Sequence, residues 1–320
     1  MNFFLKRFSR ILRMQNLTHV SEFHLMGFSD DPDLQLVLFG NFLSMYMVSV
    51  LGNLLLILAV SSDTHLHTPM YFFLSILSLV DICFTSTTVP KMIVDILTHS
   101  RVISYVGCLT QMSLFVLFCC MDDMLLTVMA YDRFVAICHP LHYAVTMSAH
   151  RCALLLLVSV FLSLGDSQLH NSAIFLSTCF KHMKIANFFC DPSLLLKLSC
   201  SDPLLNTVVT YIAGVIFGFF PILGIIFSYY KIVSSVLKIP SSEGRYKAFS
   251  TCSSHLSAVC LFYGTGLGMY LGSDGSYSPI RNMVASLMYT VVTPMLNPFI
   301  YSLRNRDISR TLKRILSLRV

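Results

Sequence analysis

The chain has 320 residues, of which 55% are hydrophobic and only 12% are charged, and its mean hydropathy is +0.71. Soluble domains carry about 25% charged residues, so this composition excludes a soluble globular domain and predicts a protein of the lipid bilayer. The net charge is +6, but the basic residues are scattered without an aromatic-interleaved face, so we expect no nucleic-acid partner.

The apolar sequence divides into seven segments. Four windows contain no Asp, Glu, Lys or Arg, and each reaches the ~20 residues that a helix needs to span a bilayer. These windows are 34–62, 203–230, 248–273 and 282–303. Three further apolar runs cover 69–93, 104–137 and 152–168. We therefore predict an all-α membrane protein, a seven-transmembrane helix bundle that forms one domain over residues 1–320.

The distribution of basic residues predicts the orientation. With the N-terminus outside, the cytoplasmic segments hold twelve Lys and Arg and the outer loops hold six, as the positive-inside rule requires. Residues 1–33 would then be extracellular and 304–320 a cytoplasmic tail, with a long second extracellular loop over 166–202. The first fourteen residues do not follow the positive-inside rule in this orientation, because they would add four basic residues to the outside.

The segment 305–318 has apolar residues at spacings of three and four among Arg and Lys. This pattern predicts a short amphipathic helix on the inner leaflet. The alternative is a solvated tail.

Several polar groups lie in or beside the apolar segments. Asp132 and Arg133 stand near the end of the run 104–137, Asp122 falls near the middle of the same run, and Asp81 falls near the middle of the run 69–93. Charged groups beside hydrocarbon are costly, so they usually have a function. The chain has no His-Glu-x-x-His sequence, nucleophile elbow or phosphate-binding loop, so we do not expect an enzyme.

Four strings resemble those of the olfactory (odorant) receptors, a branch of the rhodopsin-like G-protein-coupled receptors. They are LHTPMYFFLS at 66–75, MAYDRFVAICHPLHY at 129–143, KAFSTCSSHL at 247–256 and PMLNPFIYSLRN at 294–305. The resemblance covers roughly residues 15–318, and the strings at 86–92 and 103–111 are similar to olfactory receptor family 7. Members of the family usually begin near a sequence like the one at Met14, so residues 1–13 look like an extension.

The resemblance implies a switch at the cytoplasmic end. In it, Asp132 holds Arg133 through a charge-assisted hydrogen bond, and release lets Arg133 contact a G protein. The alternative is a purely structural ion pair. The residues of the switch are Asp132, Arg133, Tyr229, Asn297, Pro298 and Tyr301.

The resemblance also implies a sodium site formed by Asn53, Asp81, Asp122 and Asn297, because hard oxygen ligands suit a hard cation. No other cofactor is expected. The alternative is a protonated, hydrogen-bonded pair of acids. Asp123 departs from the family pattern, since an apolar residue is usual there.

Four cysteines lie in segments predicted to be outside, namely Cys108, Cys179, Cys190 and Cys200. Four cysteines allow three pairings, and spacing does not choose among them. The family resemblance implies Cys108–Cys190 and Cys179–Cys200.

The resemblance places a ligand pocket between helices three, five, six and seven. Its lining is apolar with a few hydroxyls, which suits a small, neutral or weakly polar organic molecule. The predicted lining residues are Phe115, Val116, Cys119, Cys120, Ala213, Gly214, Phe217, Tyr263, Gly266, Leu267, Tyr270, Leu287 and Thr290.

The implied function is that of an odorant receptor in the plasma membrane of olfactory neuron cilia. It would bind a small volatile organic ligand and activate a stimulatory, olfactory-type heterotrimeric G protein, which raises cyclic AMP. One alternative is a receptor-like chain with impaired folding or signalling, because the chain has no Trp and Val160 stands where helix four commonly has one. A transporter or channel would need inverted repeats or a polar pore stripe, and neither is visible.

The sequon Asn16-Leu17-Thr18 tests the orientation. If the N-terminus is outside, Asn16 carries a glycan. Endoglycosidase treatment should then increase the gel mobility of the wild type and leave Asn16→Gln unchanged. Membrane-inserted protein in which neither form shifts would contradict the orientation.

Overall fold

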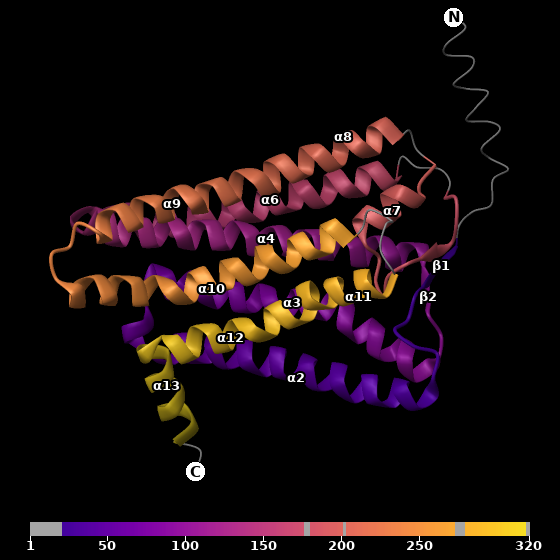
Figure 1. Ribbon diagram of the computed structural model, residues 1–320, viewed down its shortest axis with the longest axis horizontal. Coiled ribbons are helices and arrows are strands. Elements are labelled where there is room, and N and C mark those ends of the chain that lie inside the picture. The colour runs from indigo at the N-terminus through magenta and orange to yellow at the C-terminus, as the bar shows by residue number, and fades with distance from the viewer. Residues whose placement is uncertain (1–20, 176–179, 201–202, 273–278, 318–320) are drawn as a thin grey trace, which may run out of the picture.

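The computed structural model describes residues 21–175, 180–200, 203–272 and 279–317, and its long helices lie side by side in one bundle (Figure 1). Six helical spans in the described residues are long and apolar enough to cross a membrane. They are Pro32–Ser62, Pro69–Thr98, Tyr105–Cys138, Ala149–Phe175, Thr207–Val236 and Pro279–Ser302. Helix α10 (Ser242–Gly272) has 31 residues and packs against α4, α9, α11 and α12. It completes the predicted seven-helix bundle.

Local sequence determines where the first three spans begin. Helix α2 (Pro32–Ser62) starts with a proline, and its N-cap Asp31 accepts a hydrogen bond from the Asp33 amide at 3.0 Å. Helix α3 (Pro69–Thr98) also starts with a proline. Helix α4 (Tyr105–Cys138) is capped by Ser104, whose hydroxyl accepts from the Gly107 amide at 3.1 Å. Proline and short polar side chains are favoured at these positions because the first amides of a helix lack backbone partners.

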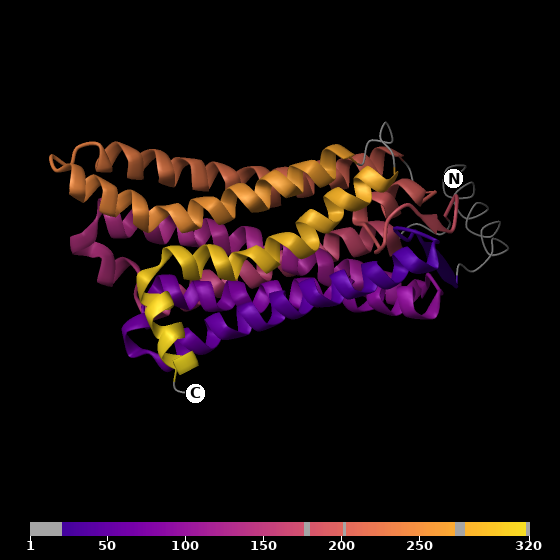
Figure 2. The ribbon, with the colours of Figure 1, turned by 60° about the horizontal axis from the view of Figure 1, so that its bottom comes forward.

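Helix α4 lies at the centre of the bundle. It contacts α3, α6 (Ala149–Phe175) and α9 (Phe220–Val236), and both ribbon views show it flanked by neighbours (Figure 2). The side chains of Phe84, Leu125 and Met129 are almost fully buried in the apolar core around it. Residues on α4 therefore reach more partner helices than residues elsewhere.

The fifth and seventh spans each contain a π-helical segment, which the sequence analysis did not predict. The fifth consists of α8 (Pro203–Gly214), the π segment η3 (Val215–Phe219) and α9. The seventh consists of α11 (Pro279–Leu287), the π segment η4 (Met288–Val292) and α12 (Thr293–Arg304). Short π segments inside α-helices frequently occur at functional sites.

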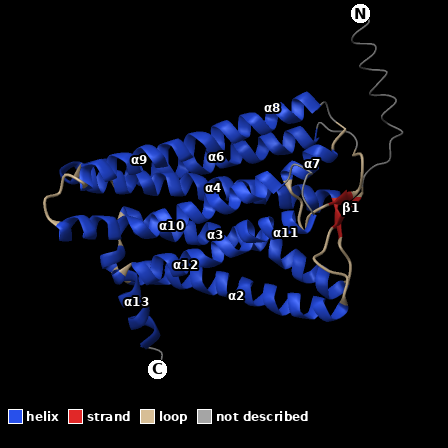
Figure 3. Ribbon diagram, in the orientation of Figure 1, coloured by secondary structure: helices blue, strands red, loops and turns tan. Residues whose placement is uncertain are grey.

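A small sheet covers the end of the bundle opposite the one that carries α13 (Figure 3). Its strand order is β2 (Val102–Ser104), β1 (Glu22–Leu25), β3 (Lys184–Ile185). Strand β1 pairs antiparallel with β2 and parallel with β3, and the side chain of Phe23 is fully buried. We call this end the sheet end. The sequence analysis predicted only an extracellular segment here and no strand.

The predicted start of the second extracellular loop at residue 166 is wrong. Helix α6 continues to Phe175, and Asp166 lies buried within it. The carboxylate is tolerated there because His170, one turn further along, places Nδ1 3.3 Å from Asp166 Oδ1. The described part of the loop contains β3 and α7 (Pro192–Leu198), which Asp191 caps.

The opposite end of the bundle carries α13 (Arg306–Ser317), which confirms the predicted C-terminal helix. We call it the α13 end. Asp63, which follows α2, accepts hydrogen bonds from the Thr311 hydroxyl at 2.7 Å and from Arg314 at 3.0 Å. The hydrogen bond from Thr311 lowers the pKa of Asp63 below its usual range. Because Ile308 is also fully buried, α13 is held against the bundle. The remaining elements at this end are η1 (Thr64–Leu66), η2 (Pro140–His142) and α5 (Tyr143–Thr146).

Strand β1 provides a test of the sheet. Truncating a buried Phe typically costs about 3–5 kcal/mol, so Phe23→Ala should lower the melting temperature of the detergent-solubilised protein. His24→Ala is the matched control, because His24 lies on the exposed face of the same strand. Equal melting temperatures for the two variants would show that the strand does not support the fold.

Candidate functional site

The Asp132–Arg133 pair lies at the α13 end and is buried there. Arg133 Nη2 donates to Asp132 Oδ2 at 2.9 Å, and the Tyr143 hydroxyl donates to Asp132 Oδ1 at 2.8 Å. Asp132 is 0% exposed and Arg133 only 8%. Burial and the neighbouring Asp132 carboxylate raise the pKa of Tyr143 above its usual range, so its hydroxyl keeps the proton that it donates. Both Asp132 carboxylate oxygens are thus engaged.

Arg133 is less completely satisfied than Asp132. Its Nε is buried without a hydrogen-bond partner among the described residues. The hydroxyl of Tyr301 is likewise buried and unpartnered. An unmade hydrogen bond costs more than a made one contributes, so both groups would gain from a different arrangement of the same end.

Tyr229 is held by a histidine from α10. Its hydroxyl lies 2.7 Å from His255 Nδ1, and His255 Nε2 lies 3.0 Å from the carbonyl oxygen of Leu126 on α4. The two rings stack with an interplanar angle of 12°. His255 therefore ties α4, α9 and α10 together beside the switch. The sequence analysis quoted the string that contains it without assigning it a role.

The predicted sodium ligands lie in the middle of the bundle. Asn297 Nδ2 donates to both oxygens of Asp81, at 3.2 and 3.0 Å, and Asn53 donates to the carbonyl of Pro294 at 3.1 Å. Three buried oxygens have no partner within the described residues: Asn53 Oδ1, Asp122 Oδ1 and Asn297 Oδ1. Such oxygens fit a hard cation. The described residues contain no group of three or more His, Cys, Asp or Glu suited to a metal ion.

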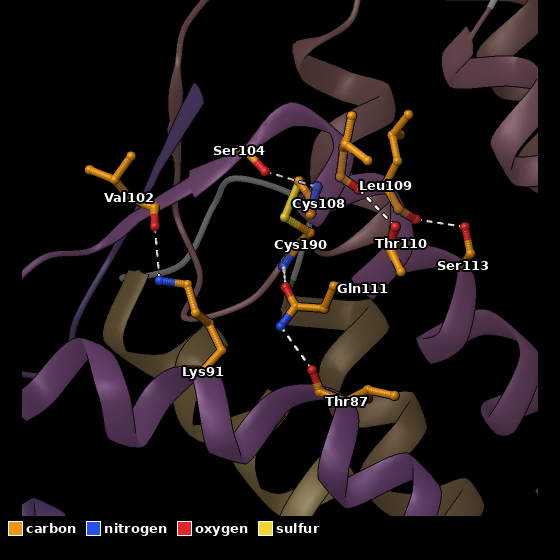
Figure 4. The surroundings of a disulfide bond; sticks show 12 residues. Thr87, Lys91, Val102, Ser104, Cys108, Leu109, Thr110, Gln111, Ser113 and Cys190 are labelled. Atoms are coloured by element: carbon orange, nitrogen blue, oxygen red, sulfur yellow. Dashed lines mark hydrogen bonds between the residues drawn. A yellow bond between two sulfur atoms is a disulfide. The ribbon is translucent and has the colours of Figure 1, made fainter. Parts of the chain in front are cut away.

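The predicted Cys108–Cys190 disulfide is present and joins α4 to the loop before α7, with the two Cα atoms 5.5 Å apart. Gln111, one turn along α4, reinforces it (Figure 4). Its Oε1 accepts from the Cys190 amide at 3.0 Å and its Nε2 donates to the carbonyl of Thr87 on α3 at 2.9 Å. One side chain therefore fixes the loop relative to two helices.

The loop places two aromatic residues beneath the sheet end. Phe189 is fully buried, and its ring centroid lies 4.9 Å from that of Phe115. Phe188 is also buried and packs against Phe189. Asn187 donates to the Ser286 hydroxyl on α11 at 2.9 Å. These contacts tie the loop to α4 and α11, and the sequence analysis assigned none of the three loop residues a role.

One predicted pocket residue of α4, Cys119, meets a residue of η4 that was not predicted, Tyr289. The thiol of Cys119 lies 2.8 Å from the Tyr289 hydroxyl. A side chain at Gly266 would meet the Tyr289 ring at 3.1 Å, so α10 and η4 pack closely at this glycine. Thr290 is 0% exposed, and its hydroxyl has no partner among the described residues. Phe217 lies in the other π segment, η3.

Asp123 makes a contact that explains its departure from the family pattern. Its Oδ1 accepts a hydrogen bond from the Tyr263 hydroxyl of α10. Asp122 makes no such contact, and its Oδ1 is buried without a partner among the described residues. Adjacent residues on a helix point about 100° apart, so the two neighbouring acids point in different directions.

Some predicted pocket residues do not converge on an enclosed cavity. Leu267 is 60% exposed and Tyr270 58%. A groove of about 550 Å³ between α4 and α6 and a cavity of about 20 Å³ behind β1 are both lined by other residues. The complete pocket lining therefore stays a prediction.

Two predicted modifications involve residues outside the described ones. Cys200 is disulfide-bonded, but Cys179 lies outside the described residues, so the Cys179–Cys200 pairing stays a prediction. Asn16 lies outside them as well.

Comparison with known proteins gives a consistent assignment. The family described as olfactory receptor matches residues 42–319. Human olfactory receptor 7E24 is 69% identical over 313 residues, which cover 98% of this chain and 92% of that protein. Mouse olfactory receptor 7E178 is 67% identical, over 94% of this chain and 91% of that protein. Human olfactory receptor 7D4 is 58% identical, over 96% and 98%.

The disulfide gives a test of the loop's role. Cys108→Ala and Cys190→Ala should reduce surface protein equally, and the double variant should be little worse, because each removes the same bond. Loss of a structural disulfide typically costs ~2–5 kcal/mol in small domains. Cys260→Ala, which removes an exposed free cysteine, is the control. Additive losses from the two single variants would contradict a shared bond.

Proposed function

This chain belongs to the olfactory receptor family, and we propose that its buried polar groups form the signalling path of an odorant receptor. It is a multi-pass membrane receptor and not an enzyme. Its ligands are small odorants and its partner is a G protein, as in the family generally.

The observation that carries the proposal is the restrained Arg133. A guanidinium at the end of a membrane helix is costly, and here Asp132 holds it while Tyr143 holds Asp132. In the resting receptor this pairing keeps Arg133 from the surface of the α13 end. When the pairing opens, Arg133 and Tyr229 contact the G protein, which we propose is the stimulatory olfactory type that raises cyclic AMP.

Tyr301 and the Asn297–Pro298 turn link this event to the rest of α12. Pro298 removes one backbone hydrogen bond from the helix, which makes it a place where the helix can bend. The unpartnered Tyr301 hydroxyl can then take a partner that the resting state does not provide.

Sodium is the cofactor that suits the middle of the bundle. Asp81, Asp122, Asn53 and Asn297 would hold it, since three of these residues present buried oxygens without partners. A bound cation would supply the positive charge that this acidic region lacks. It would thereby stabilise the resting arrangement of α3, α4 and α12.

We propose that the sheet end faces outside and the α13 end faces the cytoplasm. The positive-inside distribution supports this orientation, as does the disulfide at the sheet end, because disulfides persist in oxidising compartments. The odorant would bind beneath Phe188 and Phe189, between α4, α10 and the two π segments. The plasma membrane of olfactory cilia is the location that this function requires.

The switch can be tested without a known odorant. Asp132→Asn should raise basal cyclic AMP about tenfold, because the hydrogen bond to a charged group that it weakens is worth ~1.5–3 kcal/mol and each 1.4 kcal/mol is tenfold. Adding Arg133→Ala to Asp132→Asn should abolish that increase. Cyclic AMP is measured at matched surface staining, with Arg151→Ala as the control for removing an exposed Arg from the same end.

Persistent basal signalling in the double variant would overturn the role of Arg133 and leave the family membership standing. A chain that reaches the surface but gives no cyclic AMP in any form, including Asp132→Asn, would instead support the impaired-receptor alternative. An odorant panel on the wild type completes the comparison.

A further inference from the structure

A groove on the surface of the bundle lies between α4 and α6, near the sheet end. Its volume is about 550 Å³, and all its lining residues belong to these two helices. Two of them, Val106 and Phe175, are 71% and 75% exposed. Because both helices are long and apolar enough to cross a membrane, the groove opens toward lipid, and a membrane component must fill it.

The groove lies at the depth of the membrane interface. A helix rises about 1.5 Å per residue, so the 27 residues of α6 extend about 40 Å, which is the thickness of a bilayer with its head groups. Gln168 precedes the end of α6 at Phe175 by roughly 10 Å. This is the level at which head groups meet hydrocarbon. Five of the eight lining residues are polar, namely Thr110, Ser113, Gln168, Asn171 and Ser172.

Two amide side chains in the groove have unused hydrogen-bonding capacity. The Ser113 hydroxyl donates to Asn171 Oδ1 at 2.7 Å, which leaves the N–H groups of the Asn171 amide without a partner among the described residues. The exposed Gln168 side chain likewise makes no hydrogen bond to a described residue. Hydrocarbon cannot satisfy these groups, so a ligand that forms hydrogen bonds here is favoured over an acyl chain.

The lining also favours a ligand whose polar group is neutral. Among the described residues that line the groove there is no Lys, Arg, His, Asp or Glu. Proteins bind phosphate groups with Arg or Lys, so a phospholipid head group finds no counter-charge in this groove. A hydroxyl both donates and accepts hydrogen bonds, and therefore suits amides that offer both kinds of atom.

The surface between the groove and the middle of the bundle is apolar. Leu164 and Phe161 lie four and seven residues before Gln168, on the same face of α6, and they are 40% and 70% exposed. On α4, Leu114 follows Thr110 by one turn and is 38% exposed. A ligand that anchors a polar group in the groove would therefore lay an apolar body along these side chains. A rigid body loses less conformational entropy on binding than a flexible chain does.

We propose that the α4–α6 groove is a binding site for a membrane sterol. Its single hydroxyl bonds to the amides of Gln168 and Asn171, and its fused rings lie along Leu114, Leu164 and Phe161. The site is separate from the predicted odorant pocket, because none of its lining residues belongs to that pocket. A bound sterol would bridge α4 and α6 from the lipid side and stabilise their packing.

The probe is a photoreactive cholesterol, presented to the purified full-length receptor in phosphatidylcholine nanodiscs. Labelled residues are identified by peptide mass spectrometry. The competitors are cholesterol and its mirror image, which affect an achiral property such as bilayer thickness equally but differ in a shaped site. Ceramide is the third competitor, as a neutral lipid with flexible chains. Melting temperatures show that each variant is folded.

The variants separate the amides from the rest of the surface. Gln168→Leu removes an amide that has no internal partner, and Ser172→Trp fills part of the groove. Asn41→Leu is the matched control, because it removes an exposed amide from α2 at a similar distance from the sheet end.

We expect saturable labelling of residues 106–114 and 161–175, with cholesterol competing better than its mirror image or ceramide. Gln168→Leu should raise the cholesterol content needed for half-maximal competition about fivefold, as expected for the loss of one hydrogen bond between neutral groups. Ser172→Trp should abolish saturable labelling, and Asn41→Leu should match the wild type.

Labelling spread over all lipid-facing helices, or equal competition by the mirror image, would show that the sterol acts only as bulk lipid and would overturn the proposal. Stronger competition by ceramide would overturn the choice of a sterol. Wild-type behaviour of both folded groove variants, or an equal loss in Asn41→Leu, would also overturn the site. Each result is independent of the cyclic AMP measurements that test the signalling function.

Discussion

Hydrocarbon cannot solvate polar groups, so a polar side chain inside the bundle must find its partner on its own helix or on a neighbouring one. Helix α4 supplies several of the contacts between elements because it lies at the centre. At the sheet end it carries the disulfide and Gln111, in the middle Asp123, and at the α13 end Asp132, which accepts a hydrogen bond from Tyr143 of α5. The neighbouring helices are thereby fixed relative to α4 by specific bonds, whereas apolar contacts alone would allow them to slide.

The same constraint identifies the buried polar groups whose hydrogen bonding is incomplete in this structure. Four of the unpartnered buried atoms belong to Asp122, Asn297, Tyr301 and Arg133, and these residues run from the middle of the bundle to the α13 end. A second arrangement that satisfied some of these atoms would recover part of the free energy that their burial costs. Populations of two such states respond to a ligand that binds one of them better, which is the physical requirement for a receptor.

Sequence was sufficient for features that depend on long patterns. The apolar windows predicted the spans, and the family resemblance predicted the Cys108–Cys190 bond. Features that depend on tertiary partners were missed. Nothing local distinguishes Phe23 as a strand residue, because β1 exists only through pairing with β2 and β3. The end of α6 was misplaced because Asp166 resembles a loop residue until His170 is seen beside it. Gln111 and His255 are polar residues within apolar runs, and this pattern in the sequence could have predicted that they bond to neighbouring helices.

The long-range hydrogen bonds have a consequence for how the chain is made. Asn53 is bonded to Pro294, Asp81 to Asn297 and Asp63 to Thr311, so these three partners of the first two spans and of Asp63 lie near the end of the chain. Chains emerge from the ribosome N-terminus first, and α2 and α3 must therefore reside in the membrane with these polar groups unsatisfied until α12 and α13 have been synthesised. During that interval the nascent protein depends on lipid head groups, water or a chaperone for the missing partners. Truncation near the C-terminus would therefore leave Asn53, Asp81 and Asp63 without these partners.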